Sequence, residues 1–132
     1  MIGSVVAGLP RLLVVDDEEA ILDATRDYFT ASGFWVDCAR EREEAEALLA
    51  TEDYELVISD MRLTGAHGRE GLELLGLLRE RCPRTRTIVL TAYRSPELEG
   101  EAMRRGADRF LQKPIPLAEV ARMARQLLER PA

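Results

Sequence analysis

Four short apolar runs in this chain each stop at a polar residue, and this repetition limits the folds that the chain can adopt. The runs, each with the residues that follow it, are 12–15 with Asp16 and Asp17, 56–59 with Asp60, 87–90 with Thr91, and 110–112 with Lys113. Apolar runs of this length are typical of strands that are buried on both faces of a sheet. If these strands are parallel neighbours, their carboxyl ends bring three carboxylates, a hydroxyl and an ammonium group to the edge where open α/β sheets bind ligands.

Segments with helical periodicity separate the apolar runs. Residues 18–30, for example, carry apolar side chains at the i, i+3, i+4 and i+7 spacing of a helix that lies on a core. The expected strands are residues 11–15, 34–39, 55–59, 86–90 and 107–112, and the expected helices are residues 18–30, 41–50, 70–81, 95–106 and 116–129. Strands and helices that alternate in this way predict a parallel sheet with helices on both faces.

Composition and charge narrow the class of protein. With 132 residues, 46% of them hydrophobic, the chain fits one domain with a packed core. We expect residues 11–130 to form this domain and residues 1–10 to be a disordered lead-in or a cloning remnant. The net charge of −6 makes nucleic acid a poor direct partner, and no apolar run is long enough for a membrane span. Cys38 and Cys82 lack neighbours with metal-ligand spacing, which favours reduced thiols in a cytoplasmic protein.

The acidic residues at the strand ends predict a metal site. Asp16, Asp17 and Asp60 would repel one another unless a cation lies among them. All-oxygen ligands suit a hard divalent ion, so Mg²⁺ is the expected ion and Mn²⁺ remains an alternative. Taken alone, Asp16 and Asp17 could also be an acidic start to the first helix, which the helix dipole would stabilise.

Three residues at this edge could handle a phosphoryl group. Asp60 could be the nucleophile, since carboxylates form acyl phosphates. Lys113, the only lysine among 18 basic residues, could neutralise charge on the phosphoryl oxygens, and Thr91 could donate its hydroxyl to one of them. His67, the only histidine, could shuttle protons, although a solvent-exposed loop residue is the simpler interpretation.

These motifs together resemble the receiver domain of bacterial two-component response regulators. The matching stretches are Val14-Val15-Asp16-Asp17-Glu18, Ile58-Ser59-Asp60-Met61, Val89-Leu90-Thr91-Ala92 and Lys113-Pro114. The resemblance implies a flavodoxin-like (βα)5 doubly wound sheet with strand order 2-1-3-4-5. It implies a phosphoprotein rather than an enzyme: a histidine kinase or a phosphotransfer protein would donate a phosphoryl group to Asp60, and the domain would switch conformation to control an output.

The resemblance also implies individual roles. The metal ligands would be Asp16, Asp17, Asp60 and the backbone carbonyl of Arg62. The switch hydroxyl would be Thr91, the phosphoryl contact Lys113, the aromatic switch Phe110, and the cis peptide Lys113-Pro114.

An output domain or partner would meet the fourth helix, fifth strand and fifth helix. The arginines expected to line this face are Arg104, Arg105, Arg109, Arg122 and Arg125. Homodimer formation on phosphorylation stays open. Arg62 and Tyr93 would flank the path of a hydrolytic water, which predicts a slowly decaying phosphate.

The loop after Asp60 departs from the family pattern. It lacks the usual proline and is about two residues longer, which leaves the loop geometry and the start of the third helix open. Three other classes of protein share part of this pattern. An aspartyl-phosphate hydrolase of the haloacid dehalogenase type would have a second acid where Arg62 stands, and a flavodoxin would have a phosphate-binding loop in place of Asp16-Asp17-Glu18. A degenerate receiver that serves only as a docking module is the remaining alternative.

Overall fold

Strands and helices alternate along the chain in the predicted order. A computed structural model describes residues 8–60, 68–92 and 94–129. In chain order, the elements are β1 (Arg11–Val15), α2 (Glu19–Ala31), β2 (Trp35–Ala39), α3 (Arg42–Thr51), β3 (Leu56–Ser59), α4 (Gly68–Arg81), β4 (Arg86–Thr91), α5 (Pro96–Arg104), β5 (Arg109–Gln112) and α6 (Leu117–Glu129). The alternation of apolar runs and periodic segments predicts this α/β architecture, and the receiver resemblance implies its flavodoxin-like form.

The five strands form one parallel sheet in the order β2-β1-β3-β4-β5, which confirms the predicted order. The register places Val15, the last residue of β1, opposite Ala39 of β2 and Ser59 of β3. On the other side of the sheet, Thr91 of β4 lies opposite Gln112 of β5. Strands β1, β2 and β3 therefore end level with one another. Ser59 lies opposite Val89, so β4 and β5 extend two residues further at the same edge, where the residues that follow the strands meet.

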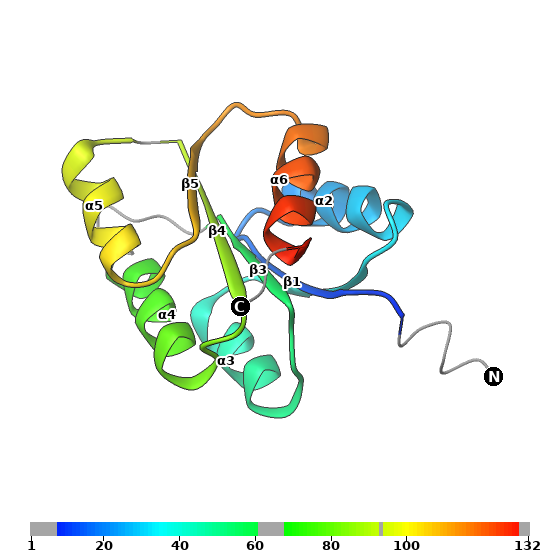
Figure 1. Ribbon diagram of the computed structural model, residues 1–132, viewed down its shortest axis with the longest axis horizontal. Coiled ribbons are helices and arrows are strands. Elements are labelled where there is room, and N and C mark those ends of the chain that lie inside the picture. The colour runs from blue at the N-terminus through cyan, green and yellow to red at the C-terminus, as the bar shows by residue number, and fades with distance from the viewer. Residues whose placement is uncertain (1–7, 61–67, 93, 130–132) are drawn as a thin grey trace.

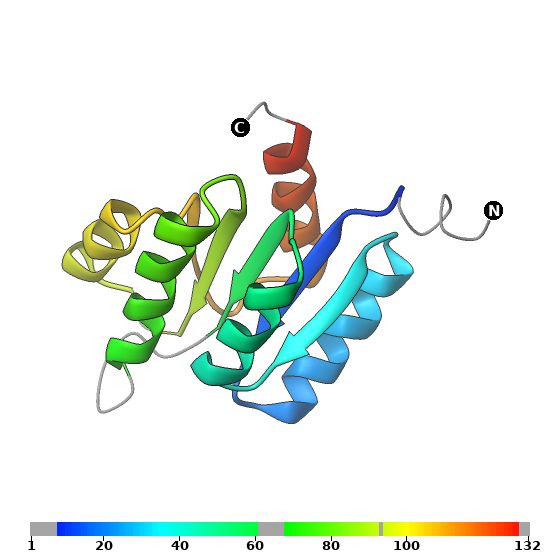
Figure 2. The same cartoon turned by 90° about the horizontal axis from the view of Figure 1, so that it is seen from below.

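The helices form two layers, one on each face of the sheet. Figures 1 and 2 show α2 and α6 on one face and α3, α4 and α5 on the other. Side chains that alternate along a strand enter opposite cores: Leu12 and Val14 pack with α2 and α6, whereas Leu13 and Val15 pack with α3 and α4. Because strands β1, β3 and β4 are buried on both faces, they carry the near-continuous apolar runs of the sequence.

Local signals explain several helix ends. Ser95 caps α5, because its Oγ accepts a hydrogen bond from the amide of Leu98 at 3.1 Å. After α2, Gly33 has a φ of 96°, a left-handed conformation that glycine adopts easily. Three predicted boundaries were wrong by two residues. Helix α5 ends at Arg104, not at residue 106. Helix α4 begins at Gly68, not at residue 70, because the first helical amides need no partner inside the helix and Glu70 favours the first turn.

Strand β5 begins at Arg109, not at residue 107, because the Asp108 side chain takes part in the pairing. The Asp108 carboxylate accepts a hydrogen bond from the Thr87 amide at 2.8 Å, and the Asp108 amide donates to the Thr87 carbonyl at 2.8 Å. A side-chain oxygen thus bonds the backbone amide of β4 at this point, in the way that Asp and Asn side chains often do at strand ends.

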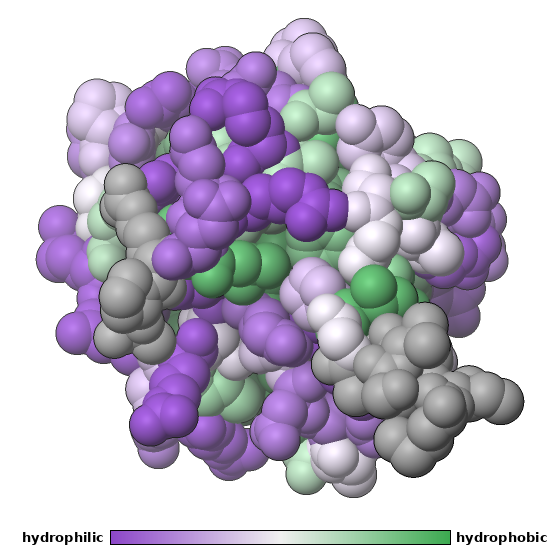
Figure 3. Space-filling model, turned by 45° about the vertical axis from the view of Figure 1, so that its right-hand side comes forward, coloured by the Kyte–Doolittle hydropathy of each residue, from purple (hydrophilic) through white to green (hydrophobic). Residues whose placement is uncertain are grey.

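The described surface is largely hydrophilic. On the face shown in Figure 3, hydrophobic side chains form small areas between hydrophilic ones. Among the described residues, the exposed large hydrophobic side chains are Trp35 and Met103. A search of the same residues finds no helix with the length and hydropathy needed to cross a membrane.

Candidate functional site

Backbone hydrogen bonds fix the residues that follow the strands. The Asp16 amide donates to the Ala39 carbonyl at 3.0 Å, and the Asp60 amide donates to the Val15 carbonyl at 2.7 Å. The Lys113 amide continues the same pattern by donating to the carbonyl of Thr91 at 2.8 Å. Each of these residues is therefore held by its neighbouring strand, although it lies one position beyond its own.

Lys113 and Asp60 form an ion pair at this edge. The distance between Lys113 Nζ and Asp60 Oδ2 is 2.8 Å, and the Asp60 side chain is only 8% exposed. Burial by itself lowers the pKa of the Lys113 ammonium group, but the hydrogen bond and charge of Asp60, with the charge of Asp16, raise it above its ordinary value. Lys113 therefore stays protonated at neutral pH and can hold an anionic group beside Asp60.

Asp16 is the most deeply buried acid of the site. It is 2% exposed, and its Oδ1 accepts a hydrogen bond from the Glu18 amide at 2.9 Å. Burial is the largest cause that raises the pKa of Asp16 to about 7, and the Asp60 carboxylate raises it further against the opposing effects of the Glu18 amide and Lys113. The site thus holds more negative charge than its own groups balance, and a cation would relieve the excess.

The residues present fit a hard divalent ion. Carboxylate oxygens of Asp16, Asp17 and Glu18 all lie within 4.8 Å of one another. Asp60 is not part of this group of three, although its carboxylate interacts with that of Asp16. Glu18 was not among the predicted ligands. The sequence pattern puts it at the start of the first helix, and in the structure it is the N-cap of α2. An all-oxygen donor set suits Mg²⁺ or Mn²⁺.

Thr91 and Phe110 lie on the neighbouring strands β4 and β5. Thr91 ends β4 and is buried. Phe110 is 6% exposed and packs in the cluster of Leu75, Val89 and Ala102. The ring is thus already buried in this structure, and the role of Phe110 as an aromatic switch stays a prediction. The peptide bond between Lys113 and Pro114 is cis, as the resemblance implies.

Three residues with predicted roles lie outside the described residues. They are Arg62, His67 and Tyr93, and with them most of the lengthened loop after Asp60. The candidate site as described therefore consists of Asp16, Asp17, Glu18, Asp60, Thr91 and Lys113.

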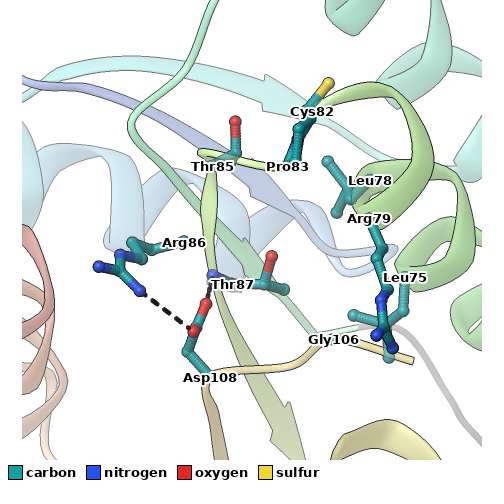
Figure 4. A pocket seen from close by; sticks show the side chains of 10 residues that line it. All are labelled: Leu75, Leu78, Arg79, Cys82, Pro83, Thr85, Arg86, Thr87, Gly106 and Asp108. Carbon is teal, nitrogen blue, oxygen red and sulfur yellow. Dashed lines mark hydrogen bonds and ion pairs between the residues drawn. The ribbon is translucent and has the colours of Figure 1, made fainter. Parts of the chain in front are cut away.

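The site borders a cavity. This cavity has a volume of about 310 Å³, and Asp16, Asp60 and Lys113 line one end of it. A second cavity of about 290 Å³ lies at the opposite edge of the sheet, where Arg86 and Asp108 form an ion pair of 3.6 Å beside Thr87 (Figure 4). None of the residues at the carboxyl edge lines the second cavity, so the first is the one that can serve their chemistry.

Comparison with known proteins agrees with this geometry. A five-stranded flavodoxin-like sheet with acids after β1 and β3 and a lysine after β5 defines the class of receiver-like α/β domains. Residues 12–125 match the family model described as the response regulator receiver domain, and this chain belongs to that family.

Curated relatives are longer proteins. The response regulator protein FleR of Pseudomonas aeruginosa is 36% identical over 105 residues, which cover 80% of this chain and 22% of FleR. The transcriptional regulatory protein QseB of Escherichia coli O157:H7 is 33% identical over 120 residues, which cover 91% of this chain and 53% of QseB. This chain thus spans between about a fifth and about a half of the length of these relatives.

Solved structures share the fold. A CheY-like response regulator receiver domain from Methanospirillum hungatei superposes with a TM-score of 0.85 at 30% identity, covering 92% of this chain and 95% of that one. A response regulator from Burkholderia pseudomallei, solved with a phosphorylated aspartic acid, a calcium ion and citrate, has a TM-score of 0.75 at 28% identity, covering 93% of this chain and 76% of that one.

Proposed function

We propose that this receiver domain accepts a phosphoryl group on Asp60 from a histidine kinase or a histidine phosphotransfer protein, with Mg²⁺ bound at the acidic residues. The observation that carries the proposal is the 2.8 Å ion pair between Lys113 and Asp60, with the buried Asp16 carboxylate beside it. The similar Burkholderia pseudomallei protein, solved with a phosphorylated aspartic acid, supports the same chemistry.

Each residue has a role in the transfer. An oxygen of Asp60 forms a bond to phosphorus, and the bond from phosphorus to the donor imidazole nitrogen breaks, with its electron pair leaving on the imidazole. Lys113 then holds a phosphoryl oxygen in place of the carboxylate oxygen that it contacts here. Asp16, Asp17 and Glu18 would hold Mg²⁺, which supplies charge neutralisation at the phosphoryl oxygens. The Thr91 hydroxyl would donate a hydrogen bond to the phosphoryl group.

This chemistry makes the chain a phosphoprotein that relays a signal, not an enzyme that turns over a substrate. The output face would be α5, β5 and α6, through which an output domain or partner senses the state of Asp60. A docking module that works without phosphorylation would not need its acidic residues and its lysine kept together. The described site retains both Asp60 and Lys113 in contact, which favours phosphoacceptance.

The test is phosphorylation of an Asp60→Asn variant. We expect the wild-type chain with Mg²⁺ and a small phosphodonor to gain one phosphoryl group, measured by intact mass, and the variant to gain none. Asp53→Asn, a change at an exposed acid before β3, is the matched control and should be labelled like the wild type. Circular dichroism should show both variants folded. A labelled Asp60→Asn chain would assign the acceptor to another residue.

A further inference from the structure

The cavity beside Asp60 has two chemically different ends. Asp16, Asp60 and Lys113 form the polar end. The rest of the wall is mainly aliphatic: Ile21 and Ala24 come from α2, Leu90 from β4, Ile115 from the segment between β5 and α6, and Leu117 from the start of α6. A ligand that fills this cavity needs a phosphoryl or other anionic head for Lys113 and a metal, and an apolar tail for the wall.

The volume sets the length of that tail. A cavity of about 310 Å³ has room for on the order of ten water molecules at the ~30 Å³ that each occupies in the liquid. The methyl group of an acetyl group would leave most of the aliphatic wall in contact with water. A chain of three or more carbons beyond the carbonyl would cover Ile21, Ala24 and Leu117, which border the cavity on the side of α2 and α6.

We propose that this cavity receives the acyl chain of an acyl phosphate and makes Asp60 selective for donors with acyl chains longer than acetyl. The inference rests on the proposed function, because it concerns the donor for the same acceptor. An Asp60 oxygen bonds to phosphorus, the bond between phosphorus and the acyl oxygen breaks, and the carboxylate leaves with the electron pair. The leaving carboxylate needs no proton.

Burial of the chain gives the expected magnitude. Each methylene that is fully removed from water favours binding by about fourfold, from ~0.8 kcal/mol per buried methylene. Butyryl phosphate has two methylenes more than acetyl phosphate, and the cavity is open to solvent on one side. We therefore expect butyryl phosphate to give about fivefold higher kcat/KM for phosphorylation of Asp60 than acetyl phosphate, with the difference mainly in KM.

The experiment compares donors that share the phosphoryl group and differ in the tail. The full chain with Mg²⁺ is phosphorylated by acetyl, butyryl and hexanoyl phosphate and by phosphoramidate, which has no acyl tail, and initial rates are measured by intact mass. Each rate is divided by the rate of the same variant with phosphoramidate, so that general effects on the acceptor cancel. Ala24→Leu fills the cavity, and Ala31→Leu, on the same helix but not part of the cavity wall, is the matched control.

The expected result is a higher normalised rate with butyryl phosphate, lost in Ala24→Leu and kept in Ala31→Leu. Equal normalised rates for all chain lengths in the wild type, or an advantage that survives in Ala24→Leu, would overturn the inference while leaving the proposed function intact. If Ala24→Leu instead slowed only transfer from a phosphohistidine protein, the cavity would serve a protein partner and the inference would be wrong. Labelling by none of the donors would overturn the proposed function itself.

Discussion

Asp16 links the acidity of the site to the stability of the fold. Its pKa is about 7 in the folded protein against an ordinary value of 3.8, chiefly because it is buried. Between these two pH values the folded chain binds more protons than the unfolded chain, so the free energy of unfolding falls as the pH rises. The slope can reach ~1.4 kcal/mol per pH unit.

We expect the metal-free protein to have a lower melting temperature at pH 7.5 than at pH 5.5. The difference should be several degrees, at roughly 3–5 °C per kcal/mol for a domain of this size. Asp16→Asn removes the titrating group and should flatten this part of the profile, while Asp53→Asn should keep it. Mg²⁺ at pH 7.5 should raise the melting temperature again, because it binds the folded site. Thermal melts in EDTA and in Mg²⁺ measure all of this, and an unchanged slope in Asp16→Asn would show that another group is responsible.

At this scale the sequence predicted residue types and positions but not every contact. The Lys113–Asp60 pair could be foreseen, because both residues follow strands that the apolar runs place in one sheet. The closeness of the Glu18 carboxylate to those of the other two acids could not, because it depends on the turn between β1 and α2.

At the scale of the elements, two glycines with opposite surroundings give a matched test. Gly76 lies inside α4, and a Cβ atom there would meet nothing within 4 Å. Gly106, just after α5, has a φ of 107°, and a Cβ atom would lie 3.3 Å from Cδ of Arg79. Gly76→Ala should therefore stabilise the fold by up to ~1 kcal/mol, and Gly106→Ala should destabilise it by ~1–2 kcal/mol. Urea unfolding of both variants measures the two signs, and a stabilised Gly106→Ala chain would contradict the left-handed turn.

Helix α5 is the element best suited to respond to the site. It has nine residues, of which only Ala102 is fully buried, and arginines tie it to α4. Arg105 donates to the Leu72 carbonyl at 3.3 Å, and Arg79 donates to the Arg104 carbonyl. A short helix with a single fully buried residue opens more easily than one with a wide buried face.

Amide exchange should locate this response. Beryllofluoride with Mg²⁺ mimics the phosphoryl group, and we expect it to change exchange rates in α5, β5 and α6 while α3 keeps its rates. Asp60→Asn, which should not bind the mimic, is the control and should show no change. Unaltered exchange in α5 of the wild type would place the output elsewhere.

One arginine of the predicted output face, Arg125, packs against the end of α2 instead. The guanidinium group of Arg125 lies 5.1 Å from the centre of the Phe34 ring and donates to the Ser32 carbonyl, beside the end of α2. Spacing fixes the angle of a residue around its helix, but the neighbour it meets depends on how the helices pack. The sequence therefore predicted the order of the elements better than the surface of α6.

For the whole molecule, the topology was the most predictable feature. Alternating runs and periodic segments predict the two helical layers, and the receiver resemblance implies the order β2-β1-β3-β4-β5 that the sheet adopts. The ends of the elements were less predictable, because side chains such as Asp108 replace backbone partners there. The loop after Asp60 lies outside the described residues, so its predicted lengthening stays a prediction.

Trp35, the only tryptophan of the chain, stands at the opposite edge of the molecule from Asp60. It begins β2, is 41% exposed, and lies 5.8 Å from the guanidinium carbon of Arg11, at the amino ends of the strands. A five-residue strand separates it from the site by roughly 15 Å. The intrinsic fluorescence of this protein is therefore an optical probe of unfolding that should stay silent when Mg²⁺ or beryllofluoride binds. A ligand-dependent emission change would mean that the signal crosses the length of the sheet.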